Sequence, residues 1–146
     1  MPIVRGCNLP DDLLYDVENN IWYRDNADGT ATLGMTSVAA AMAGQLVAFT
    51  PKRTGRPVQA GKSCATIESG KWVGPVKIAF DAELVETNDG LVTNPKLANS
   101  DPYGAGWLVK VRPVDWATGK AGLAPGTAAA ALYEAKMAAD GFAGCV

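Results

Sequence analysis

The chain has 146 residues, of which 48 % are hydrophobic and 19 % charged, and its net charge at pH 7 is −2. This length suits a single globular domain over residues 1–146, and so small a charge gives no electrostatic signal for binding nucleic acid or an anionic membrane. Because the sequence has no histidine, it excludes Ser–His or Cys–His catalysis and histidine-ligated metals, and we expect no metal site.

The first half of the chain alternates short β-favouring segments with turn signals. Residues 10–16 begin with Pro and two acids, which suits a short helical turn, and a helix is predicted over residues 36–44, capped by Thr36 or Ser37 and ended by Gly44. Asp28-Gly29 between two such segments indicates a hairpin. Strands are predicted over residues 21–25, 30–35 and 45–51.

The second half continues in the same way and ends in a helix. Residues 127–140 favour helix, with Thr127 as a cap and Gly141 as the exit. Loops are expected over residues 51–63, 91–106 and 115–126, and strands over residues 64–67, 72–80, 81–87 and 107–113. Many short strands with frequent turns predict a mainly β fold, a sandwich or barrel, with one short internal helix and one C-terminal helix.

Lys71 lies in a short polar interruption between two strand-like runs. A lysine in such a turn is most often a solvated charge. Glu68 and Ser69 are polar, and Gly70 permits a positive φ, so the lysine is expected at the apex of a hairpin. An enzyme that modifies lysine needs an amine displayed in this way.

The segment ESGK, residues 68–71, resembles the ESxK lipoylation motif of the glycine cleavage H-protein family. The resemblance extends to the run VETNDGLVTNPKLANSDPYGAGWLVKVRP and, upstream, to IWYRDNADGTATLGMTSVAAAMAGQLVAFTP. The order and spacing of these motifs hold from about residue 13 to residue 136. The positions that match in the downstream run are Asn88, Leu91, Pro95, Leu97, Asn99, Pro102, Tyr103, Gly106, Trp107, Lys110 and Pro113.

This resemblance implies a lipoyl carrier and not an enzyme. Lipoate would be attached to Lys71 through an amide, within a barrel-sandwich hybrid of two antiparallel sheets. Glu68 and Ser69 match the motif that the lipoylating enzyme reads, and Gly70 stands where the family often has valine. Trp72 is expected either to shield the dithiolane or form a docking face, or to be a strand residue packed on the sheet.

The sequence departs from the glycine cleavage pattern beside Lys71. Trp72 replaces a small residue, a Ser-Gly pair is missing after Pro75-Val76, and no histidine precedes the first tryptophan. The opening RGCNLPDDLLY, the core ESGKWVGP and the Gly-Cys near the end resemble the lipoate-binding proteins of the heterodisulfide-reductase-like sulfur-oxidation pathway. That branch is therefore the expected one.

Three functions follow from the resemblance. The first is a swinging arm in sulfur oxidation, with a heterodisulfide-reductase-like complex as partner. The second is a glycine cleavage H-protein that carries an aminomethyl group between glycine decarboxylase, aminomethyltransferase and dihydrolipoamide dehydrogenase. The third is a scaffold without lipoate. The first two also require a lipoate ligase or lipoyl-assembly enzymes, and the chain is expected to be a monomer.

The three cysteines, Cys7, Cys64 and Cys145, have no CxxC spacing, which disfavours a structural metal site. Three cysteines are too few for a disulfide framework, so we expect reduced thiols. The sequence shows no signal peptide and no apolar stretch long enough to span a membrane, and we therefore expect a cytoplasmic location. Cys64 is interpreted as a small buried residue. Cys7 and Cys145 are interpreted as terminal bystanders, with exchange against a bound dithiolane as the alternative.

Acidic residues are frequent after the hairpin. They are expected to form a solvated face that could also steer a basic partner. The members of this face are Asp81, Glu83, Glu86 and Asp89.

Overall fold

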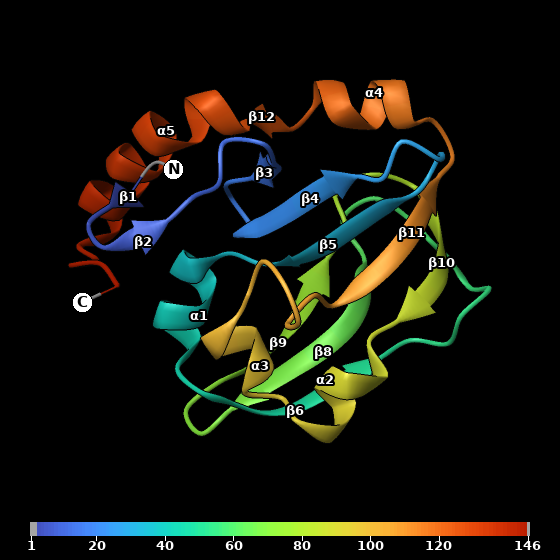
Figure 1. The fold of residues 1–146 in the computed structure, drawn as a ribbon, viewed down its shortest axis with the longest axis horizontal. Helices are drawn as coiled ribbons and strands as arrows, with labels where there is room; N and C mark the ends of the chain where they lie inside the picture. The colour runs from blue at the N-terminus through green and yellow to red at the C-terminus, as the bar shows by residue number, and fades with distance from the viewer. Residues whose placement is uncertain (1–2, 146) are drawn as a thin grey trace.

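A computed structural model of the chain describes residues 3–145, and Figure 1 shows how its strands and helices are arranged. The strands are β1 (Ile3–Val4), β2 (Cys7–Asn8), β3 (Leu14–Asp16), β4 (Ile21–Asp25), β5 (Ala31–Met35), β6 (Leu46–Pro51), β7 (Pro57–Val58), β8 (Ser63–Ser69), β9 (Val73–Lys77), β10 (Ala82–Thr87), β11 (Val109–Pro113) and β12 (Ala124–Pro125). The helices are α1 (Ser37–Ala43), α2 (Asp89–Thr93), α3 (Leu97–Ser100), α4 (Trp116–Ala121) and α5 (Gly126–Asp140).

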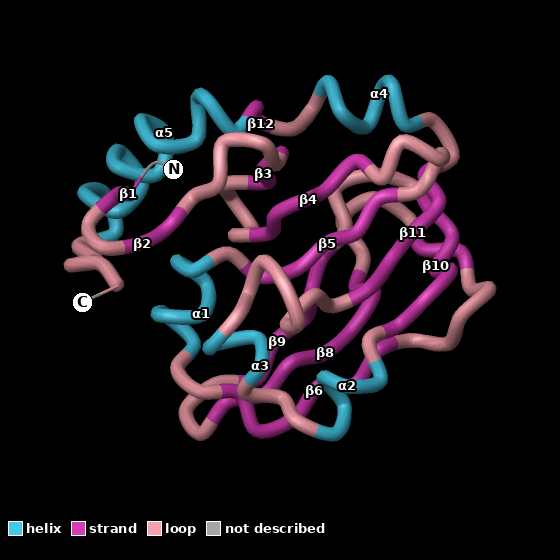
Figure 2. Tube along the Cα trace, viewed as in Figure 1, coloured by secondary structure: helices cyan, strands magenta, loops and turns pink. Residues whose placement is uncertain are grey.

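Two antiparallel sheets make up the body of the protein. The larger has seven strands in the order β12-β3-β4-β5-β11-β10-β7, and the smaller has three in the order β6-β8-β9. Strands dominate the tube representation in Figure 2, while the helices lie at its margins. The predicted mainly β fold with two antiparallel sheets and a C-terminal helix is therefore confirmed.

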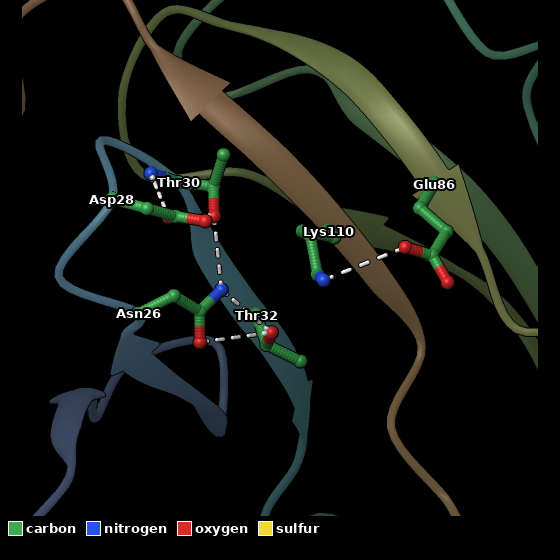
Figure 3. A network of polar contacts seen from close by, with 6 residues as sticks. All are labelled: Asn26, Asp28, Thr30, Thr32, Glu86 and Lys110. Atoms are coloured by element: carbon green, nitrogen blue, oxygen red, sulfur yellow. Dashed lines mark hydrogen bonds and ion pairs between the residues drawn. The ribbon is translucent and has the colours of Figure 1, made fainter.

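The hairpin predicted around Asp28-Gly29 joins β4 to β5, and its turn is fixed by polar side chains. Asn26 Nδ2 donates to Thr30 Oγ1 over 3.1 Å and to Thr32 Oγ1 over 3.0 Å, and Asp28 Oδ1 accepts from the Thr30 backbone N–H (Figure 3). Gly29 has φ +88°, a value that favours glycine. The side chains of the turn therefore replace the backbone bonds that the strands no longer make.

The core lies between the two sheets. Exposed residues alternate with buried ones along β9, whereas every residue of the central strand β5 is buried. A second apolar cluster fills the space between the larger sheet, α1 and α5. Its largest buried side chains include Tyr15, Trp22 and Tyr133. Burying aromatic side chains of this size against α5 stabilises that helix on the sheet.

The two ends of the described chain meet in what we call the terminal clasp, formed by the β1–β2 hairpin and residues 141–145. Cys7 and Cys145 form a disulfide, with their Cα atoms 5.0 Å apart. Arg5 makes two hydrogen bonds to the Glu134 carboxylate of α5, over 3.0 and 3.2 Å, and its carbonyl accepts from the Cys145 N–H. Figure 1 shows β1 and β2 beside α5.

This disulfide corrects the interpretation of Cys7 and Cys145 as reduced terminal bystanders. The interpretation rested on the small, odd number of cysteines and on the positions of these two near the ends of the sequence, which are 138 residues apart. A long separation does not prevent pairing when the fold brings the two ends together. Cys64 is free and buried as predicted, and burial raises the pKa of its thiol to about 12.

Several boundaries also differ from the prediction. Residues 72–80 and 81–87 do not form one continuous strand path, because β9 ends at Lys77 and β10 belongs to the other sheet. The expected loop at 91–106 contains part of α2 and all of α3, and the loop at 115–126 contains α4 and β12. Residues 10–16 lead into β3 and form no helix. These elements are too short for a periodic pattern to indicate them.

Candidate functional site

Lys71 lies at the tip of the β8–β9 hairpin, as the sequence predicted. Glu68 on β8 pairs with Val73 on β9, and the Ser69 N–H donates to the Trp72 carbonyl over 2.7 Å. Gly70 and Lys71 therefore occupy the tip beyond the last pair, and both are exposed. Because Lys71 is exposed at this tip, it is accessible to another protein.

Ser69 shapes the turn from within. Its side chain is only 5 % exposed, and its Oγ accepts from the Lys71 N–H over 3.3 Å. Glu68, in contrast, is exposed on the outer face of the sheet. Of the two motif residues that precede the glycine, Glu68 is thus presented to solvent, whereas Ser69 acts on the conformation of the backbone.

Gly70 does not have the positive φ that we expected. The glycines with φ in the left-handed region include Gly29 and Gly44 but not Gly70. A Cβ added at Gly70 would meet no atom within 4 Å. Neither backbone conformation nor space therefore requires glycine at this position.

Gly44, at the end of α1, does have an unusual conformation, and the Lys71 side chain passes over it. Gly44 has φ +80° and ends the helix, as predicted. A Cβ added there would lie 3.3 Å from Lys71 Cε and 3.9 Å from Nζ. Because Gly44 has no side chain, the aliphatic part of the Lys71 side chain can lie against its backbone. The sequence alone did not indicate this contact.

Asn99 of α3 holds the segment that follows Gly44. Its Oδ1 accepts from the Leu46 N–H over 2.9 Å, while its Nδ2 donates to the Gly44 carbonyl over 2.9 Å. A weaker contact, 3.4 Å, joins Nδ2 to the Ala40 carbonyl. One amide thus satisfies backbone groups at the end of α1 and at the start of β6.

A groove of about 560 Å³ opens on one side of Lys71, between α1 and the β8–β9 hairpin. Its walls are mainly apolar, and they come from both sheets as well as from α1. Glu18 is the single carboxylate among its lining residues. These are Glu18, Asn19, Asn20, Ile21, Met35, Ala39, Met42, Ala43, Ile67, Lys71, Trp72, Pro75, Val76 and Lys77.

The polar end of this groove is the turn before β4, and Lys136 of α5 fixes its backbone. Lys136 Nζ donates to the Val17 carbonyl over 2.6 Å and to the Glu18 carbonyl over 2.9 Å. It also contacts Asn20 Oδ1 at 3.1 Å. Partial burial lowers the pKa of Lys136, and nearby carboxylates oppose that shift. The helix thereby positions a turn that lies far from it in sequence.

A second hollow, of about 770 Å³ and more open to solvent, lies on the other side of Lys71. It is bounded by the Gly44–Val47 segment, the tip of the hairpin and the loop that joins α2 to α3. Its lining includes the polar residues Asn94 and Lys96 as well as Val47, which is an exposed apolar residue. Lys71 therefore lies between two hollows and contributes to the lining of both.

Trp72 forms one wall of the apolar groove. Its side chain is folded back along the edge strand β9, over Gly74, and the residue remains 44 % exposed. A Cβ added at Gly74 would come within 2.8 Å of Trp72 Cε2. Trp72 precedes β9 and packs on that strand at Gly74, which agrees with the alternative of a residue packed on the sheet. Its role as a shield for the dithiolane or as part of a docking face stays a prediction.

The remaining predicted side chains lie as expected. Asp81, Glu83, Glu86 and Asp89 are all exposed, which agrees with a solvated acidic face. Sequence reasoning missed Gly44, Met42 and Asn99 as neighbours of the site. Gly44 carried a signal as a helix exit, and Asn99 carried one as part of a family motif, but neither signal pointed towards Lys71.

Comparison of the chain with known proteins identifies its family. Residues 13–136 match the family model described as glycine cleavage H-protein. The chain belongs to the glycine cleavage H-protein family. The match begins after the β1–β2 hairpin and ends within α5, so the terminal clasp lies outside it.

Individual relatives support the same assignment. The chain is 51 % identical over 138 residues to "Glycine cleavage system H protein 5" of Aquifex aeolicus (strain VF5), covering 92 % of this chain and 93 % of that protein. It is 42 % identical over 114 residues to "Probable glycine cleavage system H protein 2" of Sulfurisphaera tokodaii, covering 77 % of each. A crystal structure of a glycine cleavage system H protein from Mycobacterium marinum superposes with a TM-score of 0.74 at 32 % identity, covering 85 % of this chain and 98 % of that one.

H-proteins carry covalently bound lipoate, and they work with partner enzymes instead of catalysing a reaction themselves. As a member of this family, the chain is a lipoyl carrier. The exposed amine of Lys71, with an apolar groove beside it, fits such a group. Within residues 3–145, no cluster of three or more metal-ligating side chains was found, and no helix there has the length and apolarity to cross a bilayer.

Proposed function

We propose that lipoate is joined to Lys71 through an amide and that the modified side chain serves as a swinging arm. The observation that carries this proposal is the position of Lys71 at the tip of the hairpin, where Gly44 leaves space for its stem. When bound, lipoate supplies dithiol–disulfide chemistry and carries a substrate fragment. The protein attaches the arm, orients it and presents it to partners, as a single lipoyl-carrier domain.

Recognition by a lipoate ligase or a lipoyl-assembly enzyme is proposed to involve the four residues around the lysine. Glu68 supplies an exposed charge, Ser69 fixes the backbone, and Gly70 leaves the tip unobstructed. Trp72 adds an exposed apolar surface on the other side.

Attachment is tested by coexpressing the protein with a lipoate ligase and measuring its intact mass. The wild type should gain one lipoyl group, and Lys71→Arg should gain none. Lys62→Arg and Lys77→Arg are matched controls, because both residues are exposed lysines near the ends of the same two strands. Lipoate on either of these, or no gain of mass in the wild type, would contradict the proposal. The latter result would favour the third expectation, a scaffold without lipoate.

For the pathway, we propose the glycine cleavage system, with glycine decarboxylase, aminomethyltransferase and dihydrolipoamide dehydrogenase as partners. The names of the relatives, which are glycine cleavage system H proteins, favour this function over the sulfur-oxidation function expected from the sequence. Glu18 at the polar end of the groove is also consistent with a cationic aminomethyl cargo, because a carboxylate stabilises a nearby positive charge.

The sulfur-oxidation pathway, with a heterodisulfide-reductase-like complex as partner, remains the second candidate. The observation that favours it is the composition of the groove, in which Trp72, Met35 and Met42 provide apolar, polarisable surface and Glu18 is the single carboxylate. Such a lining suits a sulfur-bound cargo without positive charge.

The two pathways are separated by reconstituting glycine cleavage with the lipoylated protein in place of an ordinary H-protein, which serves as the control. We expect decarboxylation of glycine at a rate comparable with the control. If the fully lipoylated protein fails to support the reaction, the glycine cleavage proposal is wrong and sulfur oxidation becomes the leading candidate. A monomer acting in the cytoplasm completes the proposal, and cell fractionation with size-exclusion chromatography tests both points.

A further inference from the structure

We propose that Trp72 determines where the sulfur-bearing end of the arm rests, by covering it with the face of its indole inside the apolar groove. This inference rests on the proposed attachment of lipoate to Lys71 and assigns a specificity-determining role to its neighbour. Three observations carry it: the position of the indole, the composition of the groove, and the exposure of apolar surface around Lys71.

The indole is held in place by the strand behind it. Gly74 offers no side chain, and the Trp72 ring occupies the space that a Cβ would fill. Because Gly74 is buried although it lies on an edge strand, the ring shields that backbone from water. A side chain fixed in this way provides a binding surface with little loss of conformational entropy.

The rest of the groove lining is largely apolar and contains sulfur. Met42 of α1 is 40 % exposed and Met35 of β5 is buried, and both line the same groove. Thioethers and aromatic rings interact favourably with polarisable groups such as the sulfur atoms of a dithiolane. The groove therefore favours an uncharged, sulfur-rich group next to Trp72, whereas Glu18 is the one carboxylate in its lining that complements a positively charged cargo.

Part of the large exposed apolar surface of the described chain also lies around Lys71. Met42 and Trp72 line the groove, Val73 follows Trp72 in the hairpin, and Val47 lines the second hollow. Exposed apolar surface grouped around one point indicates a binding surface. Trp72 is the largest of these side chains and follows the lysine in the sequence. It therefore offers the arm the largest exposed apolar side chain to contact.

Tryptophan emission tests the inference without any partner enzyme. A disulfide in contact with an indole quenches its fluorescence, so lipoylation should lower the tryptophan emission of the wild type. The loss should not exceed the contribution of Trp72, which is one of four tryptophans in the chain. The loss should disappear in Trp72→Phe and persist in Trp116→Phe, since Trp116 does not line the groove. Gly74→Ala should also abolish it, because the added Cβ displaces the ring and leaves the indole present.

The rate at which a small phosphine reduces the arm gives a second measurement. A covered disulfide reacts more slowly, so Trp72→Ala should react roughly two- to tenfold faster than the wild type, in line with the strength of sulfur–aromatic contacts. Lipoylation of Lys71 is established first by intact mass, and its failure would refute the attachment itself. Lipoylated protein with unchanged emission and with equal phosphine rates in the wild type and Trp72→Ala would refute the role of Trp72 alone.

Discussion

The hairpin end of the molecule and the terminal clasp are built in opposite ways. Around Lys71 the surface is apolar and exposed, and short backbone turns with one asparagine hold it in place. At the clasp, a disulfide and two hydrogen bonds between Arg5 and Glu134 join segments that form few β-sheet hydrogen bonds of their own. The family match, over residues 13–136, includes the hairpin but none of the residues that define the terminal clasp.

This difference separates two tasks. An arm that visits several partners needs an accessible lysine, and the surface around it must remain free of permanent contacts. The cross-links that stabilise the chain are placed at the other side of α1, where they do not obstruct docking. Figure 1 shows α1 between these two regions. The helix is therefore the element through which a change in the clasp would reach the groove.

Removing the disulfide should have the largest effect on this comparison. The double variant Cys7→Ala/Cys145→Ala is expected to lose about 2–4 kcal/mol of unfolding free energy, since the bond restricts the unfolded chain. Chemical denaturation measures this loss. Lipoylation by the ligase should proceed at the wild-type rate, because the hairpin keeps its own contacts.

The control for this variant is the wild type treated with a reductant. It should lose a similar amount of stability, and the reductant should not affect the double variant further. Equal stability of oxidised and reduced wild type would show that the clasp is held by its noncovalent contacts alone. A slower lipoylation of the variant would show that the two regions are not separate.

The substitution Asn99→Ala should perturb the hairpin end specifically. It leaves the Leu46 N–H and the Gly44 carbonyl without their partner, at a cost of about 1–3 kcal/mol. Hydrogen exchange should increase at residues 44–46 and remain unchanged in the clasp. Asn94→Ala is the matched control, because Asn94 is an exposed residue of the neighbouring loop. Faster exchange spread evenly over the protein would contradict a local role.

A third region, formed by the β4–β5 turn and the start of α4, should be destabilised by acid. We expect this loss of stability to be the smallest of the three. Hydrogen bonds lower the pKa of three aspartates: the Ala27 N–H does so for Asp25, the Thr30 hydroxyl for Asp28, and the Thr118 hydroxyl for Asp115. Their folded pKa values lie below the unfolded value of about 3.9. The stabilisation is thus present above that pH and is lost as the pH falls through the folded values.

Thermal unfolding at about pH 5.5 and about pH 3 measures this loss. The midpoint should be lower at the more acidic pH, and the difference should shrink in Asp28→Asn/Asp115→Asn. An identical pH dependence in the variant and the wild type would mean that other carboxylates are responsible.

Elements with strong local signals were predictable from the sequence. The β4–β5 hairpin follows from Asp28-Gly29, and α1 follows from its Thr36 cap and Gly44 exit, both of which the structure confirms. The disulfide was not predictable, because nothing near Cys7 or Cys145 indicates that the two ends meet. The short helices α2 and α3 were also missed, since five or four residues contain too little of a helical period.

The features of the site also differ in whether they could be predicted from local sequence. The position of Lys71 at a hairpin tip followed from the polar residues between two strand-like runs. Its neighbours did not, because Gly44, Met42 and Glu18 approach it only after the sheets have packed. The conformation of Gly70 was predicted wrongly: glycine permits a positive φ, but it does not impose one.

The clasp also determines how the chain carries mechanical load. Cys7 and Cys145 lie 138 positions apart in sequence but are covalently joined. A force that pulls on the two ends therefore passes from one cysteine to the other through the sulfur–sulfur bond, and the residues between them carry no tension. With the bond intact, the sheets and the Lys71 hairpin would remain folded under a pull that extends only the outermost residues. After reduction, the same pull would act on β3 and α5 and open the larger sheet from its edge.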